Sequence, residues 1–135
     1  MEVLSFLKSQ FENVGLELKP QTDGREGVDF LVGDKQLYVQ SLDLDTKRSI
    51  KISKHELGEL NENLFLVLAL VINQAPQVVY CIPSTQLANP DGRIFLKNEV
   101  IGFPSLSNWE IRVFTNSIPE LAKYALGNIS NELKN

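Results

Sequence analysis

The chain has 135 residues, 43% of them apolar and 22% charged, which predicts a single globular domain over residues 1–135. Its formal net charge of −4 excludes a protein that coats nucleic acid by bulk positive charge, although a local basic patch stays compatible with it. One cysteine excludes an internal disulfide and a cysteine-based metal site, and the absence of a leader or long apolar run predicts a cytoplasmic protein without membrane contact.

The first third of the chain carries one helical pattern and several strand patterns. The expected elements are a helix at residues 2–14 and strands at 16–19, 28–32 and 36–42. Gly15 suits the end of the helix, Pro20 ends the first strand, and Gly33-Asp34 makes a tight turn between the last two strands. Residues 20–27 contain one proline and two glycines, so we expect an exposed loop there.

The sequence after residue 42 predicts a short helix, a strand hairpin, another strand and a final helix. Ser53 and Glu56 form a capping box that starts the short helix, and Asn61 is expected to end it. The later elements are expected at residues 64–72, 77–83, 109–114 and 119–133. Because the run at 64–72 is apolar on both faces, it is expected to be a central strand.

Three features of the second half concern caps and loops. Ser84 is expected to cap a short helical turn, and Ser117 is expected to cap the final helix. Residues 89–108 hold two prolines and two glycines and are expected to be irregular. The order of the elements predicts an α/β (α+β) fold with a mixed central sheet flanked by helices.

The hairpin predicted around Gly33 brings polar side chains together. Asp29 stands at the start of its first strand, and Tyr38 and Gln40 stand on its second strand. Residues two apart on a strand point to the same face, so Tyr38 and Gln40 are expected to lie side by side. An acid and a lysine at this spacing would suit metal-dependent hydrolysis, because one would bind the metal and the other would assist the attacking water.

The same segments resemble the PD-(D/E)XK nuclease superfamily over about residues 1–85. An opening helix with Glu12 precedes a glycine-containing loop and Gly27-Val28-Asp29-Phe30-Leu31-Val32, which is similar to the glycine-x-aspartate strand of that family. Tyr38-Val39-Gln40-Ser41 falls where members carry an acid or glutamine, an apolar residue, a lysine and often a serine. Cys81-Ile82-Pro83-Ser84 also resembles a strand end of its small members. The resemblance implies a restriction-endonuclease-like core.

The resemblance also implies a degenerate active site at Asp29, Tyr38 and Gln40. Asp29 matches the metal-binding aspartate, and an active member would use Mg²⁺ or Mn²⁺ there to generate hydroxide. Tyr38 stands in place of the second acid and Gln40 in place of the lysine, and neither is a good metal ligand or a base near neutral pH. Catalysis is therefore not expected. The alternative interpretation of Asp29 is structural, as an acceptor for loop amides.

Other charged residues are candidates for a rebuilt site. Glu12 in the first helix is a weak candidate for supplying a metal ligand, and Lys51 or Lys54 a positive charge. Asp43 and Asp45 follow the second strand of the hairpin but are expected to share the face opposite Gln40. The alternative for these two aspartates is a solvated strand end that discourages edge pairing.

The strongest charge feature is the segment from Lys47 to Lys54, which contains Lys47, Arg48, Lys51 and Lys54 and runs into the predicted helix. Cations, serine hydroxyls and backbone amides all bind phosphate, so these four residues are the candidate nucleic-acid contacts. The alternative is a solvated loop whose charge is balanced by neighbouring acids.

Two hypotheses for function follow. The first is a nuclease-like domain that binds nucleic acid, weakly active or inactive. The second is an inactive copy of that fold used as a protein-interaction or regulatory module, with a protein partner or a second copy of the chain contacting an apolar patch near Leu106 and Trp109. An enzyme of other chemistry has little support, because the sequence contains one histidine, one cysteine and no cofactor loop.

Overall fold

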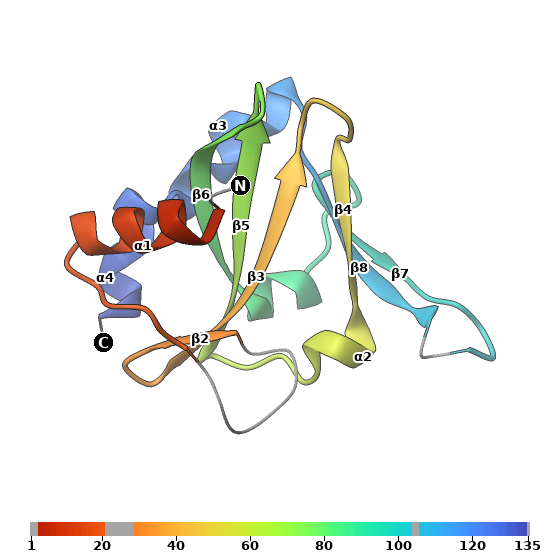
Figure 1. Cartoon of the computed structure of the whole chain (residues 1–135). Coiled ribbons are helices and arrows are strands. Elements are labelled where there is room, and N and C mark those ends of the chain that lie inside the picture. Colours follow the sequence, from red (N-terminus) through yellow and green to blue (C-terminus); the bar gives the residue numbers. More distant parts are fainter. Residues whose placement is uncertain (1–2, 21–28, 104–105, 135) are drawn as a thin grey trace.

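The computed structural model describes residues 3–20, 29–103 and 106–134. In chain order its principal elements are α1 (Val3–Asn13), β1 (Lys19–Pro20), β2 (Phe30–Val32), β3 (Lys35–Asp43), β4 (Ser49–Ser53), α2 (Lys54–Leu57), β5 (Leu64–Ile72), β6 (Ala75–Pro83), η1 (Ser84–Ala88), β7 (Phe95–Asn98), β8 (Asn108–Arg112), α3 (Ile118–Leu121) and α4 (Leu126–Leu133) (Figure 1). Within those ranges, each helix is too short or too polar to cross a membrane.

Two sheets organise the molecule. The larger has five strands in the order β1-β2-β3-β5-β6, in which β3 and β5 run parallel and the other neighbours run antiparallel. The smaller has three antiparallel strands in the order β4-β8-β7. The prediction of a mixed α/β fold with a mixed sheet is confirmed. The second sheet was not anticipated by the sequence patterns.

Strand β5 is the centre of the core, as its unbroken apolar run predicts. It pairs with β3 on one side and β6 on the other, and residues 64–71 are all at most 6% exposed. The helices α1 and α4 pack near β6, and the smaller sheet lies on the opposite side, beyond β3 (Figure 1). Leu37, Ile52 and Ile111 from the two sheets join a single buried cluster, so the two sheets share one core.

Two strands lie where the sequence predicted irregular structure. Residues 49–53 form β4, in which Ile50 and Ile52 pair with Ile111 and Trp109 of β8. The alternating isoleucines are the strand signal, and Ser49, Lys51 and Ser53 alternate with them on the other side of the sheet. The short strand β7 similarly lies inside the region 89–108 that was predicted to be irregular. The loop alternative is therefore wrong for residues 49–53, and the prediction of irregular structure is wrong at residues 95–98 but correct for most of the other described residues between 89 and 107.

Several predicted element ends also need correction. The first strand is only Lys19–Pro20, and Pro20 pairs within it at the edge of the sheet, where a missing N–H donor is tolerated. The Ser53 hydroxyl does accept from the Glu56 N–H at 3.3 Å, but α2 ends at Gly58, whose φ is 79°, well before Asn61. The predicted loop at 20–27 falls almost wholly outside the described residues, as does the start of the strand predicted at 28–32.

The predicted final helix is broken into α3, a 3₁₀ turn at residues 122–124, and α4. Ala125 interrupts it with an extended backbone, at φ −58° and ψ 139°, and forms an isolated bridge with Tyr80 of β6. The predicted cap at Ser117 is also wrong, because its hydroxyl accepts from the Phe114 N–H and donates to the Phe114 carbonyl, both at 2.8 Å. The contact with β6 outweighs the local preference for one continuous helix.

Candidate nucleic-acid interface

The hairpin of β2 and β3 positions Asp29 as predicted, at the start of its first strand. The Asp29 backbone N–H donates to the Leu37 carbonyl at 2.8 Å, and its Oδ2 accepts from the Val39 N–H at 2.7 Å. The carboxylate thus adds one hydrogen bond to the β2–β3 ladder, just before the first residue of β2. Asp29 therefore has a structural role in this fold, although its partner is a strand amide and not the loop amide that the sequence suggested.

Tyr38 and Gln40 lie on the face of β3 opposite Val39, as the strand alternation predicts. Burial raises the pKa of Tyr38, and the nearby charges of Glu56 and Asp29 raise it further. The phenol is therefore neutral near pH 7, and Gln40 is neutral by its chemistry. The two residues bring no proton-transfer group to the position of the acid and lysine in the nuclease pattern.

A groove separates β3 from β4. The two strands are consecutive in the chain, yet β3 pairs with β2 and β5 while β4 pairs with β8. Over most of their length their Cα atoms stay more than 8 Å apart, whereas paired strands lie about 5 Å apart. The space between them, called the β3–β4 groove below, has a volume of about 660 Å³ and is lined by Gln40, Ser41, Leu42, Asp43, Thr46, Lys47, Ser49, Ile50 and Lys51.

Two of the four candidate cations line this groove. Lys47 and Lys51 lie in it together with Gln40, whereas Arg48 lines a separate hollow of about 370 Å³ and donates to the Leu44 carbonyl. The basic segment is thus divided between two hollows at Lys47 and Arg48, which precede β4.

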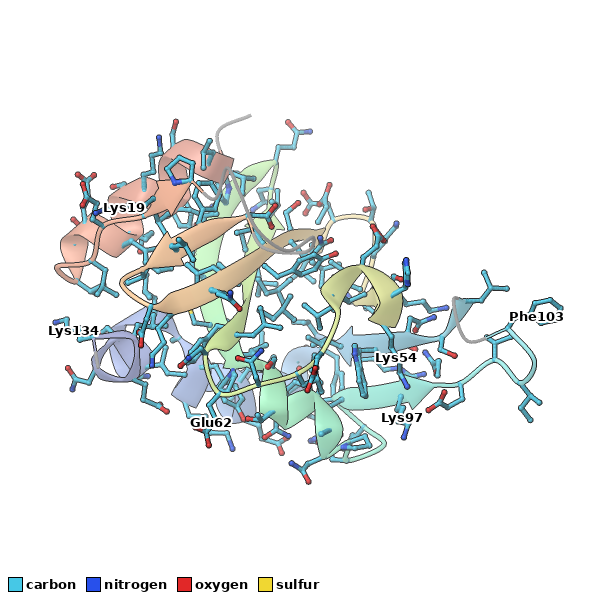
Figure 2. All side chains as sticks on the ribbon, turned by 90° about the horizontal axis from the view of Figure 1, so that it is seen from below. Lys19, Lys54, Glu62, Lys97, Phe103 and Lys134 are labelled. Atoms are coloured by element: carbon cyan, nitrogen blue, oxygen red, sulfur yellow. The ribbon has the colours of Figure 1, made fainter. Side chains whose placement is uncertain are left out.

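Lys54 is held away from the groove. Its Nζ lies 2.9 Å from Glu99 Oε1 and 4.3 Å from the centre of the Trp109 ring. Figure 2 shows Lys54 near Lys97, toward the β7–β8 hairpin that carries Phe103 at its far end. Because Lys54 is committed to an ion pair and a cation–π contact, it is the least available of the four cations.

Asp43 and Asp45 hold turns together. Asp43 Oδ1 accepts from the Asp45 N–H at 2.9 Å, and the Asp45 carboxylate accepts from the N–H groups of Asn73 and Gln74 at 3.1 and 3.0 Å. Asn73 and Gln74 have φ values of 54° and 66°, so Asp45 stabilises a left-handed turn between β5 and β6. The prediction that Asp45 is merely a solvated strand end is wrong.

The remaining candidate acid, Glu12, lies in the last turn of α1, and it is exposed. Asp29 lines a hollow of about 310 Å³ with Val3, Leu4 and Leu7 from the first half of the same helix. Among residues 3–20, 29–103 and 106–134, there is no group of three or more His, Cys, Asp or Glu side chains placed to hold a metal ion.

The sequence interpretation did not single out Thr46 and did not place Ser41 and Ser49 in one site. Thr46 and Ser49 flank or interrupt the basic segment, but only the position of β4 shows that all three line one groove. A scan of protein-family models finds no match to the chain, and no curated protein matches it significantly. The chemistry of the groove is therefore the basis for a functional assignment: lysines and hydroxyls donate to phosphate oxygens, and an amide pairs with a base edge.

Proposed function

We propose that this chain is a nucleic-acid-binding domain on a nuclease-like frame that does not cleave its ligand. The observation that carries the proposal is the gathering of Lys47, Lys51 and three hydroxyls beside Gln40 in the β3–β4 groove. Cations and hydroxyls are the side chains that most often contact the phosphate backbone.

The frame is supported by the order of the elements. A helix is followed by the β1-β2-β3 meander, which carries Asp29, Tyr38 and Gln40, and then by the parallel pair of β3 and β5, and this order is compatible with the sequence resemblance. We propose no catalysis because of the side chains at these three positions. Tyr38 and Gln40 are neutral, and the Asp29 carboxylate is bonded to the Val39 amide.

Binding and cleavage are tested together with fluorescently labelled DNA and RNA. We expect binding at low salt that is lost as salt rises, since the net charge of −4 leaves only the local lysines to attract phosphate. Lys47→Ala with Lys51→Ala should remove binding, whereas Lys8→Ala, an exposed lysine on α1, should retain it. Binding that survives the double variant, or no binding at low salt, contradicts the proposal.

Incubation of the same labelled substrates with Mg²⁺ or Mn²⁺ completes the test. We expect intact substrates with the wild-type protein and with Asp29→Ala alike. Cleavage by the wild-type protein that disappears in Asp29→Ala would show that the frame is an active nuclease, contrary to the proposal.

A second function, protein interaction, is favoured by one specific observation. The loop between β7 and β8 carries Val100, Ile101, Phe103 and Leu106, which are 36%, 96%, 63% and 61% exposed. Phe103 lies at the far end of the projecting hairpin (Figure 2). Trp109, which was predicted to share an exposed apolar patch with Leu106, is instead 8% exposed beneath Lys54. We propose that this apolar tip inserts into an apolar groove of a partner protein.

Pull-down with the wild-type protein and with Ile101→Asp plus Phe103→Asp tests the second function, followed by reconstitution with each purified captured protein. Ile118→Asp is the matched control, because Ile118 is 45% exposed and lies elsewhere, in α3. A purified partner should bind the wild-type protein and the control but not the tip variant. Equal binding to all three proteins contradicts a role for the tip.

A further inference from the structure

The charges around the β3–β4 groove restrict the form of nucleic acid that fits it. Lys47 and Lys51 lie within the groove, and Asp43 lies in it beside them. Lys51 stands opposite Glu110 in the β4–β8 ladder, and the buried Glu110 carboxylate accepts hydrogen bonds from Asn98 and Arg112. The groove itself therefore presents two lysines and one carboxylate, a small positive charge that matches one phosphate chain better than the two chains of a duplex.

Hydrogen-bond donors lie in the same groove. Ser41 lies on β3 and Ser49 lies on β4, so a serine contributes to each wall of the groove, whereas the Thr46 hydroxyl on the connecting turn donates to the Asp43 carbonyl at 3.2 Å. Beyond Val39, whose N–H donates to Asp29, β3 is paired only with β5 in the part of the chain that the structure describes. An extended strand can follow such an open edge, and a stiff duplex cannot enter between two strands.

Gln40 supplies the groove with a group that can contact a base. Its side chain is half-buried and makes no hydrogen bond to another described residue. A glutamine amide offers one donor and one acceptor side by side, which is the pattern that pairs bidentately with adenine. Bases of a single strand present these edges freely, whereas in a duplex they are reached only through the grooves.

We propose that the β3–β4 groove binds single-stranded nucleic acid, with its phosphates at Lys47 and Lys51 and an adenine base at the Gln40 amide. This inference rests on the proposed function and narrows it to one form of ligand and one base contact. With two lysine contacts, the logarithm of the binding constant should fall with the logarithm of salt concentration at a slope of about −1.4.

Fluorescence anisotropy with short labelled homopolymers of DNA and RNA, and with a duplex of equal length, tests the inference. We expect the single strands to bind about tenfold tighter than the duplex, because only one phosphate chain reaches the lysines. Lys47→Ala or Lys51→Ala should each reduce the salt slope by about 0.7, and Lys8→Ala should leave it unchanged. Duplex binding as tight as single-strand binding, with the same lysine dependence, would overturn the inference while leaving the proposed function intact.

Gln40→Ala tests the base contact separately. We expect the adenine homopolymer to bind the wild-type protein about five- to tenfold tighter than the cytosine homopolymer, and the variant to bind both equally. Gln40→Glu keeps the size of the side chain but removes its donor, so it should also lose the preference. An unchanged preference in both variants would overturn the base contact. Absence of binding by every form of nucleic acid would overturn the inference and the proposed function together.

Discussion

At the scale of single residues, the Asp29 carboxylate, which the sequence offered as a candidate metal ligand, has a structural role. Its Oδ2 accepts from the Val39 N–H at 2.7 Å, just before the first residue of β2, where β3 extends past its partner. A side chain that takes the place of a missing ladder partner protects a strand edge from a register shift. Its position in the sequence was predictable, but its partner depends on the register of the hairpin.

Substitution of Asp29 should separate these roles. Asp29→Ala removes the acceptor for Val39 and is expected to lower the free energy of unfolding by about 1–2 kcal/mol. Asp29→Asn keeps an acceptor oxygen and should cost less. Urea unfolding with and without Mg²⁺ measures both effects. A stabilisation of the wild-type protein by Mg²⁺ that Asp29→Asn abolishes would indicate a metal site instead.

Cys81 is a second residue for which the structure makes a chemical prediction. The thiol is free and fully buried in β6, and burial raises its pKa to about 12. The thiol should therefore stay protonated and unreactive toward a thiol reagent at pH 8 in the folded protein, and it should react fully in denaturant. Rapid labelling without denaturant would contradict this burial.

At the scale of elements, contacts distant in sequence determine where several segments begin and end. The fully buried Ser84 does not cap the η1 turn as predicted, since its hydroxyl donates to the Asn61 carbonyl at 2.8 Å and accepts from the Asn61 N–H at 3.1 Å. It thereby joins η1 to the segment that precedes β5.

Ser84→Ala should lower the free energy of unfolding by about 1–2 kcal/mol, because both backbone groups of Asn61 lose their partner. Thr85→Ala is the matched control, since Thr85 is the exposed neighbour in the same turn and should change stability by about 0.5 kcal/mol or less. Chemical denaturation of the two variants beside the wild type makes the comparison. Equal effects would show that the Ser84 bonds contribute little.

At the scale of the whole molecule, carboxylates stabilise the smaller sheet and the loop that enters it. Hydrogen bonds from Asn98 and Arg112 lower the pKa of Glu110, which links β7 and β8. Burial disfavours the charged form of Asp91, but N–H donation from Phe95, Arg93 and Ile94 lowers its pKa overall. Both groups thus bind protons more weakly in the folded state than in the unfolded state.

The sign of this difference predicts the acid stability of the protein. A lowered pKa contributes stability above the pKa of the unfolded chain, which is about 4 for these groups, and loses it as pH falls through the folded value. Urea midpoints should be nearly constant from about pH 5 to 7 and fall below about pH 4. Glu110→Gln should be less stable than the wild type at pH 7 and show a smaller loss in acid. If the urea midpoint of the variant fell with pH as steeply as that of the wild type, Glu110 would not contribute to the acid dependence.

The sequence by itself determined those elements whose pattern is carried by neighbouring residues. The spacing of Leu7 and Phe11 predicted α1, the Gly33 turn predicted the β2–β3 hairpin, and the apolar run beginning at Leu64 predicted the buried central strand. The face shared by Tyr38 and Gln40 also followed from strand alternation alone. These features depend on local periodicity, which a single chain displays without its partners.

Only the tertiary structure decided how the charged residues are distributed. Lys51 and Lys47 meet Gln40 because β4 leaves β3 and pairs with β8, far along the chain. Lys54 is diverted to Glu99 and Trp109, both distant in sequence. Such contacts leave no local pattern, since a residue's distant partner contributes nothing to the periodicity of its own segment. The candidate residues were therefore readable from the sequence, whereas the groove that gathers some of them required the fold.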